Sequence, residues 1–136
     1  MNSLKLFNIF YIFQKNLANS LSGIFAFFYV KIYSVFLVCI NVLIWLFAWH
    51  IMAIGPEQIA LHYTVDFGID FYGDARQIFI IPILGLIIIL FNFIIVTILS
   101  QNKDFILISH ILLIAALLSN IVLLAAISSV YLINFR

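Results

Sequence analysis

Three stretches of this sequence are long, apolar and free of Asp, Glu, Lys and Arg. They cover residues 34–54, 77–99 and 106–133. The hydrocarbon core of a bilayer is about 30 Å thick, and a helix of roughly 20 apolar residues crosses it. Each stretch therefore predicts one membrane-spanning helix. The predicted fold class is an all-α membrane protein with three transmembrane helices.

The composition excludes several other classes of protein. Charged residues make up 8% of the chain and hydrophobic residues 67%, whereas a soluble domain carries about 25% charged residues. No basic run or stripe of basic and aromatic residues indicates nucleic-acid binding. The single cysteine, Cys39, lies inside the first apolar stretch, so we expect neither an intrachain disulfide nor a thiolate metal cluster.

The residues that flank the second and third spans predict how these helices begin and end. Asp74 followed by Gln77 resembles a capping box, with Asp74 as the N-cap of the second span. In the short polar connection 100–105, Asn102 suits a left-handed turn and Asp104 suits an N-cap. The second and third spans should therefore form an antiparallel pair.

Residues 1–33 differ from the three-helix domain at 34–136. A helical wheel over residues 4–22 separates polar from apolar side chains, which predicts an amphipathic helix in the membrane interface. The polar side holds Lys5, Asn8, Lys15, Asn16, Asn19 and Ser22, and the other side holds Leu6, Phe7, Ile9, Phe10, Phe13, Leu17 and Leu21. Residues 23–33 form an aromatic ramp into the first span. A secretory signal peptide is the alternative for the start of the chain.

The distribution of Lys and Arg predicts the orientation. Four cations flank the inner ends of the spans and two flank the outer ends, which favours a cytoplasmic N-terminus. The residues 55–76 and the C-terminus should then lie outside. The inner group is Lys5, Lys15, Lys31 and Lys103, and the outer group is Arg76 and Arg136.

Each span carries one asparagine: Asn41, Asn92 and Asn120. An amide in hydrocarbon needs a hydrogen-bond partner. Asn41 and Asn92 each lie seven residues from the inner end of the predicted span, so we expect these two side chains to meet or to share a water. Packing between helices is the favoured interpretation. A polar transport path, helped by a kink at Pro82, is the alternative.

The third span also carries small residues at a spacing that favours close helix packing. Ala115 and Ser119 are four residues apart, and so are Ala125 and Ser129. Such small-xxx-small pairs let a second helix approach closely. The second helix is either the first span of this chain or a helix of another protein or another copy.

No metal, cofactor or catalytic arrangement is predicted. The three histidines, His50, His62 and His110, do not form a set, because His110 belongs to the inner end and the other two to the outer end. The spacings that zinc and calcium sites require are missing. A non-enzymatic protein is therefore expected.

The segment 55–76 holds four of the five acidic residues of the chain. It is longer than the usual connection of about 4–6 residues. Apolar residues alternate with polar ones at 63–67, and a turn follows at Gly68. This pattern predicts an ordered outer loop. A small hairpin with its aromatic residues in the membrane interface fits the pattern.

This segment, "PEQIALHYTVDFGIDFYGD", resembles the loop motif of the domain of unknown function at the N-terminus of SdpI-like immunity proteins. The motif is P-x-x-I-x-x-H-[FY]-x-x-x-G-x-x-D-x-x-G. The positions that match are Pro56, Ile59, His62, Tyr63, Asp70 and Gly73. Gly68 falls one residue later than the motif asks, and Asp-Ala-Arg stands at 74–76 where members of the family often carry a lysine. SdpI-like proteins also continue into further helices.

The resemblance implies a bacterial cytoplasmic membrane and a shared loop architecture. His62 and Asp70 look like the working pair of this loop, either hydrogen bonded to fix its conformation or in contact with a ligand. The favoured function is a small membrane protein that acts by binding, as an accessory subunit or partner-binding module. The partners expected are the lipid bilayer and other membrane subunits or further copies. The alternatives are an SdpI-like immunity or signalling protein that recognises an extracellular toxin or peptide, and a small transporter or ion-binding protein.

Overall fold

The computed structural model describes the backbone of residues 3–64, 66 and 68–135. The side chains of 3–6, 9, 13, 16–18, 62–64 and 70 lie outside the described part. In chain order the elements are α1 (Ser3–Ile24), α2 (Phe28–Ile54), β1 (Gln58–Thr64), β2 (Gly68–Asp74), the 3-10 helix η1 (Ala75–Phe79), α3 (Ile80–Ile98), the 3-10 helix η2 (Leu99–Gln101) and α4 (Phe105–Phe135).

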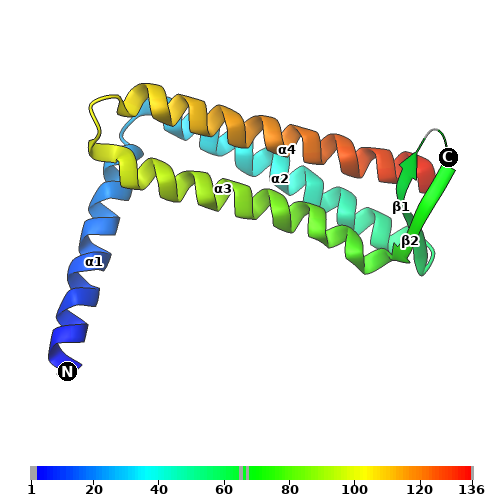
Figure 1. The fold of residues 1–136 in the computed structure, drawn as a ribbon, viewed down its shortest axis with the longest axis horizontal. Coiled ribbons are helices and arrows are strands. Elements are labelled where there is room, and N and C mark those ends of the chain that lie inside the picture. Colours follow the sequence, from blue (N-terminus) through cyan, green and yellow to red (C-terminus); the bar gives the residue numbers. More distant parts are fainter. Residues whose placement is uncertain (1–2, 65, 67, 136) are drawn as a thin grey trace.

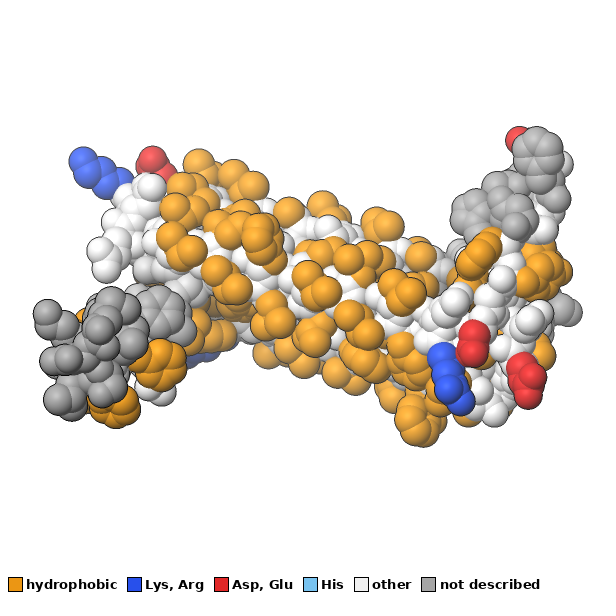
Figure 2. All heavy atoms as spheres, turned by 60° about the horizontal axis from the view of Figure 1, so that its bottom comes forward, with side chains coloured by type: hydrophobic (Ala, Val, Ile, Leu, Met, Phe, Trp, Pro, Cys, Tyr) orange, Lys and Arg blue, Asp and Glu red, His pale blue; other side chains and the backbone are white. Residues whose placement is uncertain are grey.

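Helices α2, α3 and α4 lie side by side as a bundle (Figure 1). Helices α2 and α4 contain the first and third predicted spans, whereas the second predicted span, 77–99, covers α3 together with the end of η1 and the start of η2. The helices long and apolar enough to cross a membrane are Phe28–Ile54, Ala75–Gln101 and Phe105–Phe135. Hydrophobic side chains cover the middle of the bundle, and the charged side chains in view lie at its two ends (Figure 2). The chain is an integral, multi-pass membrane protein in contact with lipid, and the predicted fold class is confirmed.

Helix α2 begins at Phe28, six residues before the start predicted for the first span. Nothing in residues 28–33 breaks a helix, and Lys31 is exposed near the helix start, where a long side chain can reach the headgroups. Most of the predicted aromatic ramp is therefore the first turns of α2. The helix is about 40 Å long at about 1.5 Å per residue, so it extends beyond the hydrocarbon core.

The bundle has two distinct ends. The connection from α3 to α4 marks one, called here the turn end, and β1 and β2 mark the other, called the hairpin end (Figure 1). The expectation that Asn102 is left-handed is wrong, because its φ is −73° and its ψ 146°. Its side-chain oxygen instead accepts the N–H of Asp104 at 3.0 Å. Helix α4 begins at Phe105, directly after Asp104, whose backbone carbonyl accepts the N–H of Ile108 at 3.1 Å.

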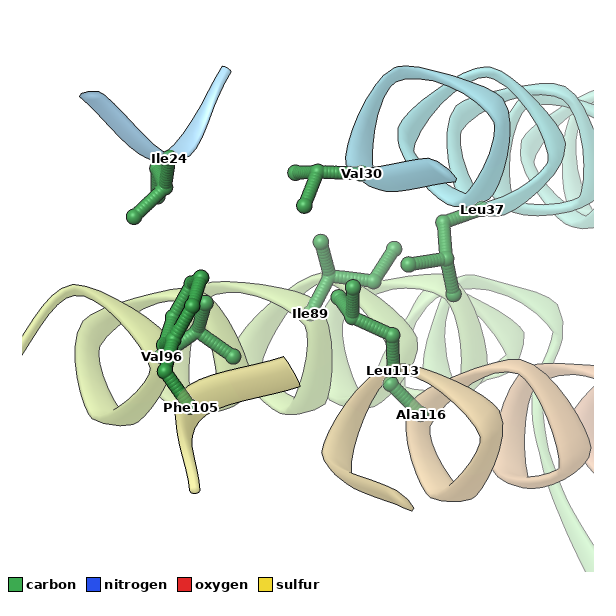
Figure 3. Close-up of a cluster of buried hydrophobic side chains, with 8 residues drawn as sticks. All are labelled: Ile24, Val30, Leu37, Ile89, Val96, Phe105, Leu113 and Ala116. Atoms are coloured by element: carbon green, nitrogen blue, oxygen red, sulfur yellow. The ribbon is translucent and has the colours of Figure 1, made fainter. Parts of the chain in front are cut away.

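Two apolar clusters form the interior of the bundle. The cluster toward the turn end joins all four helices, and Figure 3 shows its side chains converging from α2, α3 and α4. Its members are Ile24, Val30, Leu37, Ile89, Val96, Phe105, Leu113 and Ala116. The cluster toward the hairpin end joins the helices to β1 and η1. Its members are Ile44, Ala48, Ile51, Ile59, Ala75, Ile78, Ile127 and Val130.

Helix α1 leaves the turn end and runs crosswise to the bundle (Figure 1). Among the described side chains of α1, the buried Ile24 and the partly buried Leu21 in its last turns pack on the bundle. Farther along, Phe7, Phe10 and Tyr11 are exposed. The helix covers the residues 4–22 predicted to be amphipathic, and its direction suits a helix that lies along a membrane surface.

The acid-rich loop is an antiparallel hairpin of β1 and β2. Gly68 has a φ of 75°, a left-handed conformation that glycine adopts readily. The register is irregular around Leu61, where Ala60 pairs with Tyr72 but His62 pairs with Phe71. The hairpin lies at the opposite end of the bundle from the α3–α4 turn (Figure 1), so the prediction of an ordered loop at the other end from Lys103 is confirmed.

Candidate functional site

A buried cluster of amide groups lies near the middle of the bundle. Asn41 of α2 and Asn120 of α4 are 5% and 0% exposed. The Asn41 side-chain nitrogen donates to the carbonyl of Pro82 at 3.2 Å and to the Asn120 side-chain oxygen at 3.4 Å. Asn120 in turn donates to the carbonyls of Ala116 and Gly85, at 3.0 and 3.5 Å. The cluster thus joins three helices.

Gly85 makes this cluster possible. A Cβ at this position would lie 2.6 Å from the Asn41 side-chain nitrogen and 2.7 Å from the Asn120 side-chain oxygen. Such contacts are too short for any side chain, so only glycine leaves room for the two amides. Pro82, at which the sequence suggested a kink, and Gly85 therefore belong to the part of α3 whose carbonyls accept hydrogen bonds from Asn41 and Asn120.

The prediction that Asn41 meets Asn92 is wrong. Asn92 donates to the carbonyl of Ile88 in its own helix at 2.9 Å. The error follows from the earlier start of α2. Counted from Phe28, Asn41 lies about 20 Å along its helix, whereas Asn92 lies about 9 Å from the end of α3. Asn41 is therefore level with Asn120.

A second set of polar contacts fixes the hairpin to the end of α4. The Asn134 side-chain oxygen accepts the N–H of Ala60 at 2.8 Å, and its nitrogen donates to the Ala60 carbonyl at 2.9 Å. The amide thereby pairs with β1 as a neighbouring strand would. The same nitrogen also donates to the carbonyl of Val130 at 2.8 Å. The sequence analysis missed Asn134, because its partner is 74 residues away in the chain.

The described residues of the loop motif differ in burial. Ile59 is fully buried in the cluster at the hairpin end, and Pro56 is exposed just after α2. Any side chain at Gly73 would collide with Gln77 and Leu61. The side chains of His62, Tyr63 and Asp70 lie outside the described part of the structure, so the proposed His62–Asp70 contact stays a prediction.

A hollow of about 450 Å³ lies at the base of the hairpin. Glu57, Asp74 and Arg76 provide its charged walls. Asp74 also caps η1, since its carboxylate accepts the N–H of Arg76 at 2.8 Å, which agrees with the predicted role of Asp74 as an N-cap. Cationic and acidic side chains lie close together at this end of the bundle (Figure 2).

The two small-xxx-small pairs of α4 lie on its outer side. Ala115, Ala125 and Ser129 are exposed and Ser119 is half-buried, whereas Ala116 and Asn120 face the bundle. The alternative in which both small-xxx-small pairs pack on the first span of this chain is therefore wrong. The hydroxyls of Ser119 and Ser129 bond to carbonyls of their own helix, at 2.8 and 3.0 Å. These serines thus present a small surface with a satisfied hydroxyl.

An aromatic cluster at the turn end holds the third histidine. The ring of His110 stacks on Tyr29 with centroids 4.2 Å apart, and its Nδ1 lies 3.4 Å from the Tyr33 hydroxyl. The hydroxyls of Tyr29 and Ser109 are hydrogen bonded at 2.8 Å. His50 lies at the hairpin end beside Tyr131. The two histidines are at opposite ends of the bundle, as predicted, and His110 helps to join α2 to α4.

Within the described residues, no three His, Cys, Asp or Glu side chains gather as a metal site requires. Comparisons with protein families, with characterised proteins and with solved structures find no match to this chain. The resemblance of the loop to SdpI-like proteins is therefore a prediction that rests on the motif alone.

Proposed function

We propose that this protein acts by binding another membrane protein, as an accessory subunit or partner-binding module, with the outward face of α4 as the contact surface. The observation that carries this proposal is the direction of the small residues. Ala115, Ser119, Val122, Ala126 and Ser129 follow one another at alternating spacings of four and three residues, which places them along one side of a helix. Four of them are exposed and Ser119 is half-buried.

Close approach of helix backbones favours association in a bilayer, where lipid removes the hydrophobic driving force between helices. Small residues at this spacing stabilise a contact with another helix, whereas they contribute no such stabilisation where the helix contacts only lipid. The stripe on α4 gives a partner helix a shallow surface without charge. The bound helix belongs to a different protein or to a second copy of this chain.

The buried amides do not favour the transporter alternative. Asn41 and Asn120 bond to each other and to backbone carbonyls, so they hold the helices together. We place the protein in a bacterial inner membrane with a cytoplasmic N-terminus, a location that rests on the loop motif and on the distribution of Lys and Arg.

The test is native mass measurement after extraction in a gentle detergent. The wild-type protein should retain a second polypeptide chain. The double variant Ala115→Leu with Ala126→Leu fills the stripe and should reduce the retained fraction by about tenfold, equivalent to about 1.4 kcal/mol. Ala53→Leu is the matched control, because Ala53 is exposed on α2. A monodisperse wild-type monomer, or a complex unaffected by the double variant, would contradict the proposal.

A further inference from the structure

The two edges of the hairpin differ. The edge of β1 is covered, because the Asn134 side chain forms hydrogen bonds with both the N–H and the carbonyl of Ala60. Ala60 is only 2% exposed. The sheet has two strands, so β2 forms the other edge. Three of its side chains, Ile69, Phe71 and Tyr72, are 38%, 52% and 59% exposed.

The hydrogen bonds at the base of the hairpin show which groups of β2 face this edge. The N–H of Ala75 donates to the carbonyl of Glu57 at 3.1 Å, so this pair is bonded across the hairpin. In an antiparallel pair of strands, bonded and non-bonded pairs alternate. Gln58 with Asp74 and Ala60 with Tyr72 are consequently non-bonded pairs.

The position of Asn134 agrees with this alternation, because Asn134 is hydrogen bonded to the N–H and carbonyl of Ala60, which point away from β2. Tyr72, opposite Ala60, must direct its own N–H and carbonyl to the other edge. The N–H of Asp74 points the same way. Among the residues with described side chains, no hydrogen bond from outside the hairpin reaches the backbone of Tyr72. Such an edge accepts a further strand.

The charge of the hairpin end indicates what kind of strand would be accepted. Residues 56–77 carry Glu57, Asp66, Asp70 and Asp74 against the single cation Arg76. Two of these carboxylates, with Arg76, line the hollow of about 450 Å³ beside the base of β2. A second copy of the same hairpin would bring like charges together, which is unfavourable between paired strands.

We propose that β2 takes up an extended, basic segment of another polypeptide as a third strand. The segment exchanges hydrogen bonds with the N–H and carbonyl of Tyr72 and with the N–H of Asp74. One Lys or Arg side chain of the segment lies in the hollow near Glu57 and Asp74. This site goes beyond the proposed function, because it uses the hairpin outside the lipid rather than the α4 stripe.

The probe is a fluorescent peptide of about nine residues in which Lys alternates with Val and Thr. Its binding to the full-length protein in nanodiscs of zwitterionic lipid is measured by anisotropy, with empty nanodiscs as the blank. A peptide with N-methyl groups on alternate residues keeps the charge but loses the N–H groups of one edge. It should bind about tenfold more weakly, as expected for the loss of one or two hydrogen bonds.

Two variants at Tyr72 distinguish the contribution of its backbone N–H to peptide binding from that of its side chain. Tyr72→Pro removes the tyrosine side chain together with an N–H that the hairpin itself does not use, and an edge strand tolerates proline there. Tyr72→Thr keeps the N–H. The proline variant should lose about tenfold in affinity and the threonine variant about threefold at most. The N–H of Ala75 is bonded to Glu57 in the intact hairpin, so it should stay protected from hydrogen exchange in both variants.

Hydrogen exchange supplies the direct readout. Peptide binding should slow exchange of the Tyr72 N–H, whereas the Ala60 N–H, already bonded to Asn134, should not change. The proposal is wrong if the Lys peptide does not bind, if the N-methylated peptide binds equally well, or if unlabelled hairpins pair with one another instead. Ala115→Leu with Ala126→Leu should leave peptide binding unchanged, so this test and the α4 test fail independently.

Discussion

Gly85 is the residue at which a single added carbon has the largest expected effect. Alanine favours a helix over glycine by about 1 kcal/mol. At Gly85, however, the new Cβ would meet Asn41 and Asn120 at 2.6 and 2.7 Å. Overpacking of this kind costs about 1–3 kcal/mol. Gly85→Ala should therefore lower the free energy of unfolding, measured by SDS titration in detergent with circular dichroism.

Gly23 provides the matched control for this substitution, since a Cβ there meets nothing within 4 Å. Gly23→Ala should be neutral or slightly stabilising. Asn41→Ala with Gly85→Ala should cost less than the sum of the two single changes, because the smaller side chain makes room for the new methyl group. Strict additivity would show that Gly85 and Asn41 do not share one packed site.

At the scale of elements, Asn134 holds the hairpin on the bundle. Asn134→Ala would leave the buried N–H and carbonyl of Ala60 without partners, at a cost of about 1–3 kcal/mol. Hydrogen exchange in β1 should become faster while exchange in α2 and α3 stays slow. Ser129→Ala is the control, because this exposed hydroxyl bonds only to Ala125. Unchanged exchange of β1 in the Asn134 variant would mean that Ile59 alone fixes the hairpin.

The elements were largely predictable from the sequence, and their contacts were not. Long uncharged stretches determine the spans by length alone, and the turn at Gly68 follows from local chemistry. The partner of Asn41 depended on where α2 begins, and no residue near Phe28 marks that start strongly. The role of Asn134 depended on a contact across 74 residues, which no local pattern encodes.

For the whole molecule, the fold requires the two ends of the bundle to lie on opposite sides of a membrane. The bundle separates Glu57, at the hairpin end, from Lys103, at the turn end. Both side chains are exposed. In a background with Cys39→Ser, Glu57→Cys should react with a membrane-impermeant maleimide on intact cells. Lys103→Cys should react only after the membrane is permeabilised, as expected for the orientation proposed from the Lys and Arg distribution.

Cys39 itself supplies the internal control for depth. It is exposed on α2, about 17 Å from the start of the helix, which is near the middle of a hydrocarbon core about 30 Å thick. A membrane-impermeant maleimide does not enter the hydrocarbon core, so wild-type Cys39 should stay unlabelled in permeabilised membranes and react once SDS unfolds the protein. Rapid labelling of Cys39 in the membrane, or labelling of positions 57 and 103 from the same side, would contradict a bundle that crosses the bilayer.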